Sequence, residues 1–420
     1  MRVLIVSQYF WPENFRVNDL CAELVCRGHT VTVLTGVPNY PEGRVFESYI
    51  KAPGDFTHYA GASVLRAPMI PRGRGSLRLI INYVSFVIGA SFSGLTRLRD
   101  RDFDVIFVFE PSPVTVGLPA ILIGKLKKVP VVFWALDLWP ETLAAVGVVK
   151  SPRILGWVGH LVHFIYDRCA LVLGQSQGFL QYIRRYCSNP SKVRYFPSWA
   201  EEVFSDSEVM PAPEASLRRD LFNIVFAGNI GEAQDMPALL EAAETLKAHQ
   251  NIRWLIVGDG RKLEWLQAEV IQRGLQASVL LLGRHPVERM PSFYAHADAL
   301  LVSLKRDPVF AMTIPGKVQS YLMTGVPLLG MLDGEGAAVI RNAGAGLTAG
   351  SGDSQGLAAA VLELMALPAT ARAEMGRRGR DYAQREFGRR QLIDRLEAMF
   401  FEVSTSYKAT EISSIKQGGA

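Results

Sequence analysis

The first half of the chain alternates short apolar, β-branched runs with longer segments of helical periodicity. Several runs are apolar at every position, which is typical of parallel strands covered by helices on both faces. This order of elements predicts a doubly wound α/β sheet. The expected strands are residues 3–7, 31–35, 63–67, 105–109, 131–135 and 171–174. The expected helices are residues 17–27, 77–98, 114–127, 154–168 and 178–186.

The same alternation begins again after a polar, proline-bearing connector at about residues 195–219. It predicts a second Rossmann-like domain in tandem with the first. The expected strands are residues 222–227, 254–257, 279–282, 299–304 and 327–330. The expected helices are residues 236–249, 263–273, 318–323, 357–365, 371–385 and 389–401. We expect domains at 1–200 and 201–388, then at 389–420 a helix that packs back on the first domain and a tail that frays after Ser404.

Composition excludes several classes of protein. Hydrophobic residues make up 49% of the 420 and charged residues 20%, which is ordinary for a globular enzyme. The net charge of +5 is too small and too dispersed to indicate a nucleic-acid partner, but it suits anionic lipids or anionic substrates. The four cysteines form no C-x-x-C pair and indicate no disulfide framework. A strand follows Met1 without a secretion signal, so we expect a cytoplasmic protein.

Residues 79–95 form an uncharged stretch between arginines, with Arg78 before it and Arg97 after it. One interpretation is a packed helix of the α/β domain. A second is an interfacial helix that lies on lipid, with the arginines at the headgroups. A membrane-spanning helix is the third and the least favoured, because about 20 predominantly apolar residues are needed and this stretch contains polar ones.

The loops that follow strands are the expected site of function. In open α/β sheets the ligand binds outside the carboxyl ends of the strands, so two such domains place an active site between those edges. In the first domain these loops concentrate aromatic, proline and carboxylate residues, which is typical of sugar sites. Asp137, Glu141 and Glu110 are the candidate catalytic carboxylates. For Asp137 and Glu141, a helix cap and a dipole-matched first turn are the alternative.

The corresponding loops of the second domain are rich in glycine. Glycine lets backbone N–H groups approach a pyrophosphate, and two such turns at one sheet edge favour that function over a tight turn without a ligand. Lys317, at a helix start, opposes the helix dipole, so a nearby anion would explain its position. The predicted diphosphate-sugar site comprises Gly228, Asn229, Ile230, Gly231, Gly258, Asp259, Gly260, Arg284, Lys305, Lys317 and Ser320.

Other nucleotide enzymes are excluded by missing motifs. The first strand is not followed by Gly-x-Gly-x-x-Gly, which argues against a nicotinamide or flavin enzyme. The chain has no Gly-x4-Gly-Lys-Ser/Thr sequence either, so it is not a P-loop NTPase. No spacing of His, Cys and carboxylate residues indicates a metal site.

The sequence resembles the group 4 retaining glycosyltransferases of the GT-B fold, from Met1 to about Phe401. Within that group it is most similar to the WbuB-like transferases of O-antigen and capsule assembly, which attach N-acetyl-L-fucosamine or related amino sugars. Two features depart from the family pattern: Met312 and Ser320 stand where two glutamates are usual, and Glu13-Asn14 replaces a Gly-Gly loop. The resemblance is carried by residues 9–13, 27–35, 38–43, 137–141, 228–231, 257–260 and 315–321.

The resemblance implies transfer of a sugar, with retention, from a UDP- or TDP-sugar to a lipid-linked saccharide acceptor. It implies a protein peripheral to the inner face of the cytoplasmic membrane, working without cofactor or metal. The acceptor would meet Glu13, Asn14, Arg16, Asn39, Tyr40 and Trp139. Two alternatives stay open: a nucleotide-sugar epimerase of the same architecture, and a non-catalytic nucleotide-sugar-binding subunit.

Overall fold

The computed structural model describes residues 1–417 except 74, 146–148, 150, 201–211 and 213–220. The chain divides into two compact units, one of residues 1–196 with 393–420 and the other of residues 197–392. Most of the predicted connector therefore lies outside the described residues. Each unit contains one parallel sheet covered by helices, which confirms the prediction of two doubly wound domains.

The sheet of the first unit has the strand order β3-β4-β2-β1-β5-β6-β7-β8, and only β3 and β4 pair antiparallel. Its central strands are buried over almost their whole length, as their continuous apolar sequences require. The strands are β1 (Arg2–Val6), β2 (Thr30–Thr35), β3 (His58–Tyr59), β4 (Ala62–Arg66), β5 (Val105–Glu110), β6 (Val131–Ala135), β7 (Leu171–Gly174) and β8 (Val193–Tyr195).

Helices α3, α4 and α6 of this unit are neighbours. A Cβ atom at Gly94 of α3 would lie 2.4 Å from Ile123 of α4, and one at Gly117 of α4 would lie 2.7 Å from Ile165 of α6. Glycine at these contacts therefore lets the helices pack closely. The helices are α1 (Arg16–Cys26), α2 (Glu47–Lys51), α3 (Ser76–Arg97), α4 (Gly117–Lys127), α5 (Glu141–Ala145), α6 (Pro152–Arg168) and α7 (Gln177–Arg185).

The sheet of the second unit has the order β11-β10-β9-β12-β13-β14 and is parallel throughout. The order reverses at β9, so the loop after β9 lies at the point where such sheets bind ligands. The strands are β9 (Phe222–Ala227), β10 (Ile252–Val257), β11 (Val279–Gly283), β12 (Ala299–Ser303), β13 (Leu328–Met331) and β14 (Gly346–Ala349). The helices are α8 (Met236–Thr245), α9 (Leu263–Gln272), α10 (Met290–Tyr294), α11 (Pro308–Ala311), α12 (Gly316–Thr324), α13 (Gly334–Asn342), α14 (Ser354–Ala366) and α15 (Ala369–Phe387).

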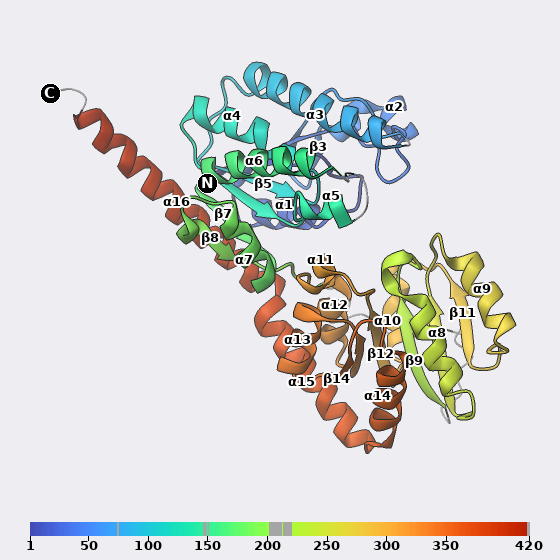
Figure 1. The fold of residues 1–420 in the computed structure, drawn as a ribbon. Helices are drawn as coiled ribbons and strands as arrows, with labels where there is room; N and C mark the ends of the chain where they lie inside the picture. Colours follow the sequence, from blue (N-terminus) through green and yellow to red (C-terminus); the bar gives the residue numbers. More distant parts are fainter. Residues whose placement is uncertain (74, 146–148, 150, 201–211, 213–220, 418–420) are drawn as a thin grey trace. The chain divides into compact units, whose positions relative to one another are not determined.

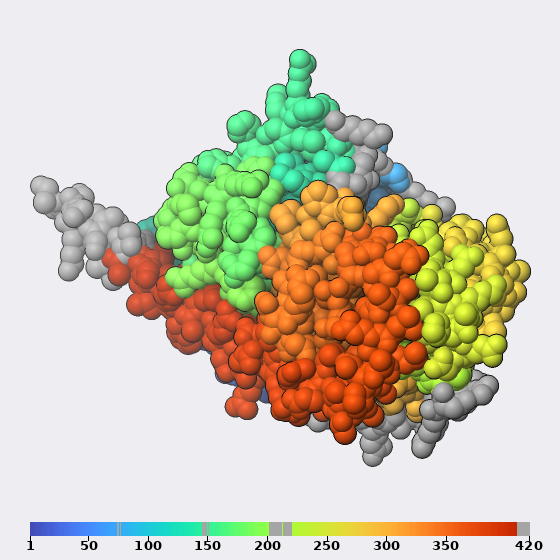
Figure 2. Space-filling model, turned by 60° about the horizontal axis from the view of Figure 1, so that its bottom comes forward, coloured from blue at the N-terminus to red at the C-terminus, as the bar shows by residue number. Residues whose placement is uncertain are grey.

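The last helix, α16 (Arg389–Gln417), belongs mainly to the first unit. Its Leu396 and Phe400 are fully buried, and its Glu402 accepts two hydrogen bonds from Arg194. Figure 2 shows this helix (red) beside the light-green segment that contains Arg194's strand. The predicted return of the C-terminal helix to the first domain is thus confirmed. The helix extends to Gln417, beyond the predicted end near Phe401, through a stretch without glycine or proline, and the fraying after Ser404 stays a prediction.

Candidate functional site

The glycine loops of the second unit nest against each other and against Lys317. Gly228 and Gly258 have φ of +137° and +145°, a conformation that side chains disfavour. A Cβ atom at Gly228 would lie 2.5 Å from Lys317 Cε, and one at Gly258 would lie 1.9 Å from the Gly228 carbonyl oxygen. Backbone conformation therefore favours glycine at both positions, and the space is taken by Lys317 at Gly228 and by the Gly228 backbone at Gly258.

Lys317 has an unusual environment for an ammonium group. Its Nζ atom is covered by protein and has no hydrogen-bond partner among the described residues. The positive charge is stabilised by a cation–π contact with the ring of Phe226, whose centroid lies 3.7 Å from Nζ. Burial lowers the pKa of Lys317 to about 7. A buried cation without an acceptor is costly, so the site is incomplete until an anion reaches it.

The backbone amides of these loops divide into used and unused donors. The N–H groups of Gly228 and Ile230 donate to the carbonyls of Val257 and Asp259, at 2.8 Å in each case. Gly258 N–H donates to the Gly283 carbonyl at 2.7 Å, and Gly260 N–H donates to Asp259 Oδ1 at 2.7 Å. Within the described part of the chain, Asn229 and Gly231 keep amides that donate no hydrogen bond. The loop that Lys317 approaches at Gly228 thus offers two free donors.

The other predicted donor residues lie around this centre. Lys305 is exposed, and its Nζ lies 3.3 Å from Glu232 Oε1. Lys262, which the sequence analysis missed, lies 2.8 Å from Glu232 Oε2. Ion pairs this exposed contribute little stability, so both ammonium groups can turn to another anion at small cost. Arg284 is exposed after β11, and Ser320 is buried on α12.

In the first unit, Glu110 and Asp137 lie next to each other at the carboxyl edge of the sheet. Glu110 ends β5 and is fully buried, and its Oε1 has no hydrogen-bond partner among the described residues. Its Oε2 accepts a long, 3.4 Å hydrogen bond from the Asp137 N–H. Burial, reinforced by the charge of Asp137, raises the pKa of Glu110 well above its ordinary value. Glu110 has no exposed surface, and its predicted role in catalysis stays a prediction.

The Asp137 carboxylate is occupied by its own loop. Its Oδ1 accepts from the Leu138 N–H at 2.9 Å and from the Thr142 hydroxyl at 2.6 Å. Its Oδ2 accepts from the Trp139 indole at 3.2 Å, and the Ser112 hydroxyl supplies another hydrogen bond. Four donors are as many as a carboxylate has good sites for. These contacts favour the interpretation of Asp137 as the residue that holds the loop between β6 and α5.

Two of the predicted acceptor residues are likewise engaged inside the protein. Glu13 Oε1 accepts from the N–H groups of Asn39 and Tyr40 at 2.8 and 2.7 Å, and its Oε2 accepts from the Phe10 N–H. Fully buried Asn39 donates to the Val37 carbonyl and accepts from the Arg72 N–H. Glu13 and Asn39 therefore join the loops after β1 and β2, which corrects the expectation that their polar groups face an acceptor.

The remaining acceptor candidates differ in exposure. Asn14 is exposed, and Arg16 is half-buried at the start of α1. The half-buried ring of Tyr40 stacks near Tyr9. Trp139 is 7% exposed, and its indole is bonded to Asp137, so it is largely a core residue. Asn14, Arg16 and Tyr40 are thus the candidates with surface available to an acceptor.

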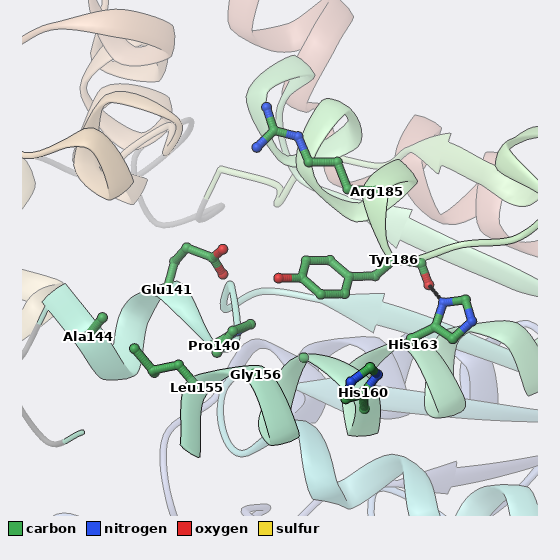
Figure 3. A pocket seen from close by; sticks show the side chains of 10 residues that line it. Pro140, Glu141, Ala144, Leu155, Gly156, His160, His163, Arg185 and Tyr186 are labelled. Atoms are coloured by element: carbon green, nitrogen blue, oxygen red, sulfur yellow. Dashed lines mark hydrogen bonds between the residues drawn. The ribbon is translucent and has the colours of Figure 1, made fainter. Parts of the chain in front are cut away.

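Glu141 lies in a pocket of about 650 Å³ within the first unit. Its Oε2 is covered and has no hydrogen-bond partner among the described residues, and the Tyr186 hydroxyl faces its carboxyl (Figure 3). Burial raises the pKa of Glu141, and the Tyr186 hydrogen bond partly opposes this. The sequence analysis missed Tyr186, which is 45 positions away in the chain.

The residues described by the structure include no group of three metal-ligating side chains.

Two family descriptions match the chain, one in each unit. "Glycosyl transferase 4-like domain" matches residues 14–199, and "Glycosyl transferases group 1" matches residues 222–366. A curated relative is the putative colanic acid biosynthesis glycosyl transferase WcaI of Escherichia coli (strain K12). It is 25% identical over 341 residues, which cover 77% of this chain and 82% of the relative.

Solved structures share the fold over nearly the whole chain. HepE of Anabaena in complex with UDP has a TM-score of 0.69 at 12% identity, covering 96% of this chain and all of that one. WaaG, described as a glycosyltransferase involved in lipopolysaccharide biosynthesis, has a TM-score of 0.66 at 13% identity. That likeness covers 95% of this chain and 99% of WaaG. These likenesses establish the fold of the two units.

Proposed function

We propose a substrate for this chain from the premise that it belongs to the group 1/4 glycosyltransferases of the GT-B fold, which are retaining and dependent on nucleotide sugars. The chain transfers a sugar from a UDP- or TDP-sugar to a saccharide acceptor carried on a lipid. The sugar is an N-acetylated amino or deoxy sugar of the N-acetyl-L-fucosamine kind, as the resemblance to WbuB-like transferases implies. The product serves the synthesis of a bacterial surface polysaccharide.

The observation that carries this proposal is the buried ammonium of Lys317 beside the glycine loop after β9. Cleavage of a sugar–diphosphate bond leaves a nucleoside diphosphate whose negative charge must be stabilised. Lys317 supplies an unpaired cation, and Asn229 and Gly231 supply the two free amides. HepE, which shares the fold, has UDP bound in its structure. This supports a uridine nucleotide as the donor's leaving group.

The polysaccharide context rests on the relatives. WcaI is described by its role in colanic acid biosynthesis and WaaG by its role in lipopolysaccharide biosynthesis. Both roles concern surface polysaccharides, in agreement with the resemblance of the sequence motifs. In the first unit, Asp137 positions the loop beside the reaction centre, and Glu110 supports it from the core.

The test is a panel of UDP- and TDP-sugars incubated with extracted lipid-linked saccharides and scored by product mass. We expect one donor to extend an acceptor by one sugar residue with release of the nucleoside diphosphate. Turnover of a nucleotide sugar without any acceptor, with its sugar–phosphate bond intact, would show the epimerase alternative instead. Binding of a nucleotide sugar without any product would show the non-catalytic subunit. Either result contradicts the proposal.

A membrane contact is part of the proposal, and helices α3, α4 and α6 carry it. Helix α3 is long and apolar enough to cross a membrane by length and composition, with a third of its apolar window buried. Its exposed apolar residues recur at helical spacing along one face, and α6 adds Trp157, which is 80% exposed. The α3 residues of this face are Leu77, Ile80, Ile81, Val84, Ile88, Phe92 and Leu95.

The charges around this face match an anionic bilayer. Helices α3 and α4 contain no acidic residue, and α3, α4 and α6 carry the exposed cations Arg78, Arg97, Lys125 and Arg153. Apolar side chains between cations are typical of helices that lie at a lipid interface. We therefore place α3, α4 and α6 on the inner face of the cytoplasmic membrane, with the sugar chemistry in the cytoplasm.

Ile88→Glu should weaken binding to vesicles rich in phosphatidylglycerol by about tenfold or more, because a carboxylate replaces an apolar contact and is repelled by the lipid. Co-sedimentation measures the affinity. Ile271→Glu is the matched control, since Ile88 and Ile271 are each 64% exposed but Ile271 lies on α9 of the other unit. Equal vesicle binding by the two variants would remove α3 from the membrane contact.

A further inference from the structure

A pocket of about 650 Å³ lies between the start of α5, one face of α6 and the end of α7, all in the first unit. Its volume falls within the roughly 300–1,000 Å³ that is typical of ligand sites. Figure 3 shows the Tyr186 hydroxyl pointing toward the Glu141 carboxyl, with Leu155 and Gly156 on another side of the pocket. The roles described above for Glu110, Asp137 and Glu13 do not involve this pocket, so its function is still unassigned.

The polar groups of the pocket include both acceptors and donors. The covered Oε2 of Glu141 has no hydrogen-bond partner among the described residues, so it is an acceptor in need of a donor. Arg185 and His160 are exposed at the rim, and the positive charge of Arg185 acts to lower the pKa of Glu141. The backbone of Tyr186 is held by a hydrogen bond, since its carbonyl oxygen lies 3.0 Å from His163 Nδ1 (Figure 3).

The rest of the lining is apolar and open. Pro140, Ala144, Leu155 and two glycines of α6 provide surface without hydrogen-bonding side chains. A Cβ atom at Gly156 would meet no heavy atom within 4 Å, so the space beside it is empty. Apolar surface with a few convergent donors and acceptors matches a sugar, whose ring presents C–H faces and whose hydroxyls both donate and accept.

We propose that this pocket binds one sugar ring of the acceptor saccharide, with Glu141 accepting from its hydroxyls and Arg185 donating to them. This inference rests on the proposed function, which supplies a saccharide acceptor. A phosphate or diphosphate fits less well, because the Glu141 carboxyl with its open oxygen would face the anion. The pocket thus selects acceptors by the sugar residue that it binds. That residue is either the one to which the new sugar is attached or the one next to it in the acceptor.

Gly156→Leu tests the pocket by filling it. The leucine side chain has room at that helical position, and replacing glycine inside α6 favours the helix by up to about 1 kcal/mol, so the variant should fold. Gly156→Ala is the matched control, since it makes the same backbone change and leaves most of the pocket open. Thermal unfolding measured by circular dichroism checks that both variants are folded.

With the acceptor found in the mass panel, Gly156→Leu should raise the acceptor KM by about tenfold or more, with the donor KM within about twofold of the wild type. Gly156→Ala, which leaves most of the pocket open, should raise the acceptor KM far less than Gly156→Leu does. Glu141→Gln, which keeps the shape but alters the open acceptor, should also raise the acceptor KM. An unchanged acceptor KM in Gly156→Leu overturns the inference while leaving the proposed function intact.

A second readout is independent of transfer. Saturation-transfer NMR with methyl glycosides of glucose, galactose and N-acetylglucosamine reports sugar binding without any donor. We expect a signal with wild type and Gly156→Ala and its loss with Gly156→Leu. That result supports the pocket even if no transfer is found, whereas a signal that survives in Gly156→Leu, or no signal with wild type, contradicts it.

Discussion

Lys317→Met is expected to reduce sugar transfer by about a hundredfold or more while making the protein more stable. Methionine retains an unbranched apolar side chain against Phe226 but removes the cation that meets the diphosphate. Loss of one group that stabilises developing negative charge typically costs a factor of about 10²–10³ in rate. Loss of activity together with a gain in stability cannot be attributed to misfolding.

The gain in stability follows from the pKa of Lys317. Burial lowers that pKa from 10.5 to about 7 in the folded chain. Between pH 7 and pH 10.5 the unfolded chain binds more protons than the folded chain, so the free energy of unfolding rises with pH across this range. Below about pH 7 the folded chain bears the full free-energy cost of keeping the buried ammonium charged. The penalty that corresponds to this shift is on the order of 5 kcal/mol. Lys317→Met should therefore raise the unfolding midpoint most clearly at pH 6 and lose this pH dependence.

Donor binding should then take up a proton. A diphosphate beside the ammonium raises the pKa of Lys317, so the group that is largely neutral in the free protein at pH 8 becomes charged in the complex. Titration calorimetry with UDP at pH 8, in buffers of different ionisation enthalpy, should report an uptake of close to one proton. Lys317→Met should show none.

Lys247→Met is the matched control for these measurements. Lys247 follows α8 in the same unit and donates to the Arg273 carbonyl at 2.8 Å, away from the glycine loops. Its variant should transfer sugar at the wild-type rate and take up the same proton on binding UDP. Full transfer activity in Lys317→Met would refute the assignment of this lysine to the diphosphate.

The central strands of both sheets were predictable because burial on two faces leaves mostly apolar residues, and this pattern needs no knowledge of partners. Elements that owe their form to neighbours were missed. β14 is four residues long and begins with Gly346, so it carries little signal of its own. The short helix α5 is only five residues long, and α13 begins at Gly334, whose φ of +66° is typical of a turn rather than of a helix.

The candidate site was predictable as a set of loops but not as a set of contacts. Glycines after β9 and β10 indicated close approach, yet the sequence could not show that Gly228 makes room for Lys317, 89 positions away. Nor could it show that Glu13 would be enclosed by backbone amides of another loop. Such contacts join residues that are far apart in the sequence and close only in the folded chain. The residue types by themselves are equally consistent with a catalytic role and with a structural role.

Asp137 allows these two roles to be separated by experiment. Asp137→Ala removes the acceptor of Leu138, Trp139 and Thr142 at once and leaves the nearly buried Trp139 indole unpaired. Each unpaired buried donor costs about 1–3 kcal/mol, so we expect a loss of about 3–5 kcal/mol in the free energy of unfolding. Transfer should fall by about a hundredfold or more, because the loop before α5 no longer holds the reaction centre.

Asp137→Asn should restore most of both properties. Its amide oxygen can still accept from the Leu138 N–H and the Thr142 hydroxyl, whereas its amide nitrogen then faces the N–H donor of the Trp139 indole. We expect a loss of about 1–2 kcal/mol in stability and activity within about tenfold of the wild type. Urea unfolding and initial transfer rates measure the two. Rescue by asparagine identifies Asp137 as a positioning residue.

Asp104→Ala is the control for stability alone. Asp104 also accepts a backbone amide, from Arg2 at 2.8 Å, but it precedes β5 at the opposite edge of the sheet. Its variant should lose stability and keep the wild-type transfer rate once folded. If Asp137→Asn instead has the stability of the wild type and the activity of Asp137→Ala, the charge of the carboxylate itself acts in the reaction. Asp137 would then be a catalytic residue, and the saturation of its oxygens would have to be relieved when the donor binds.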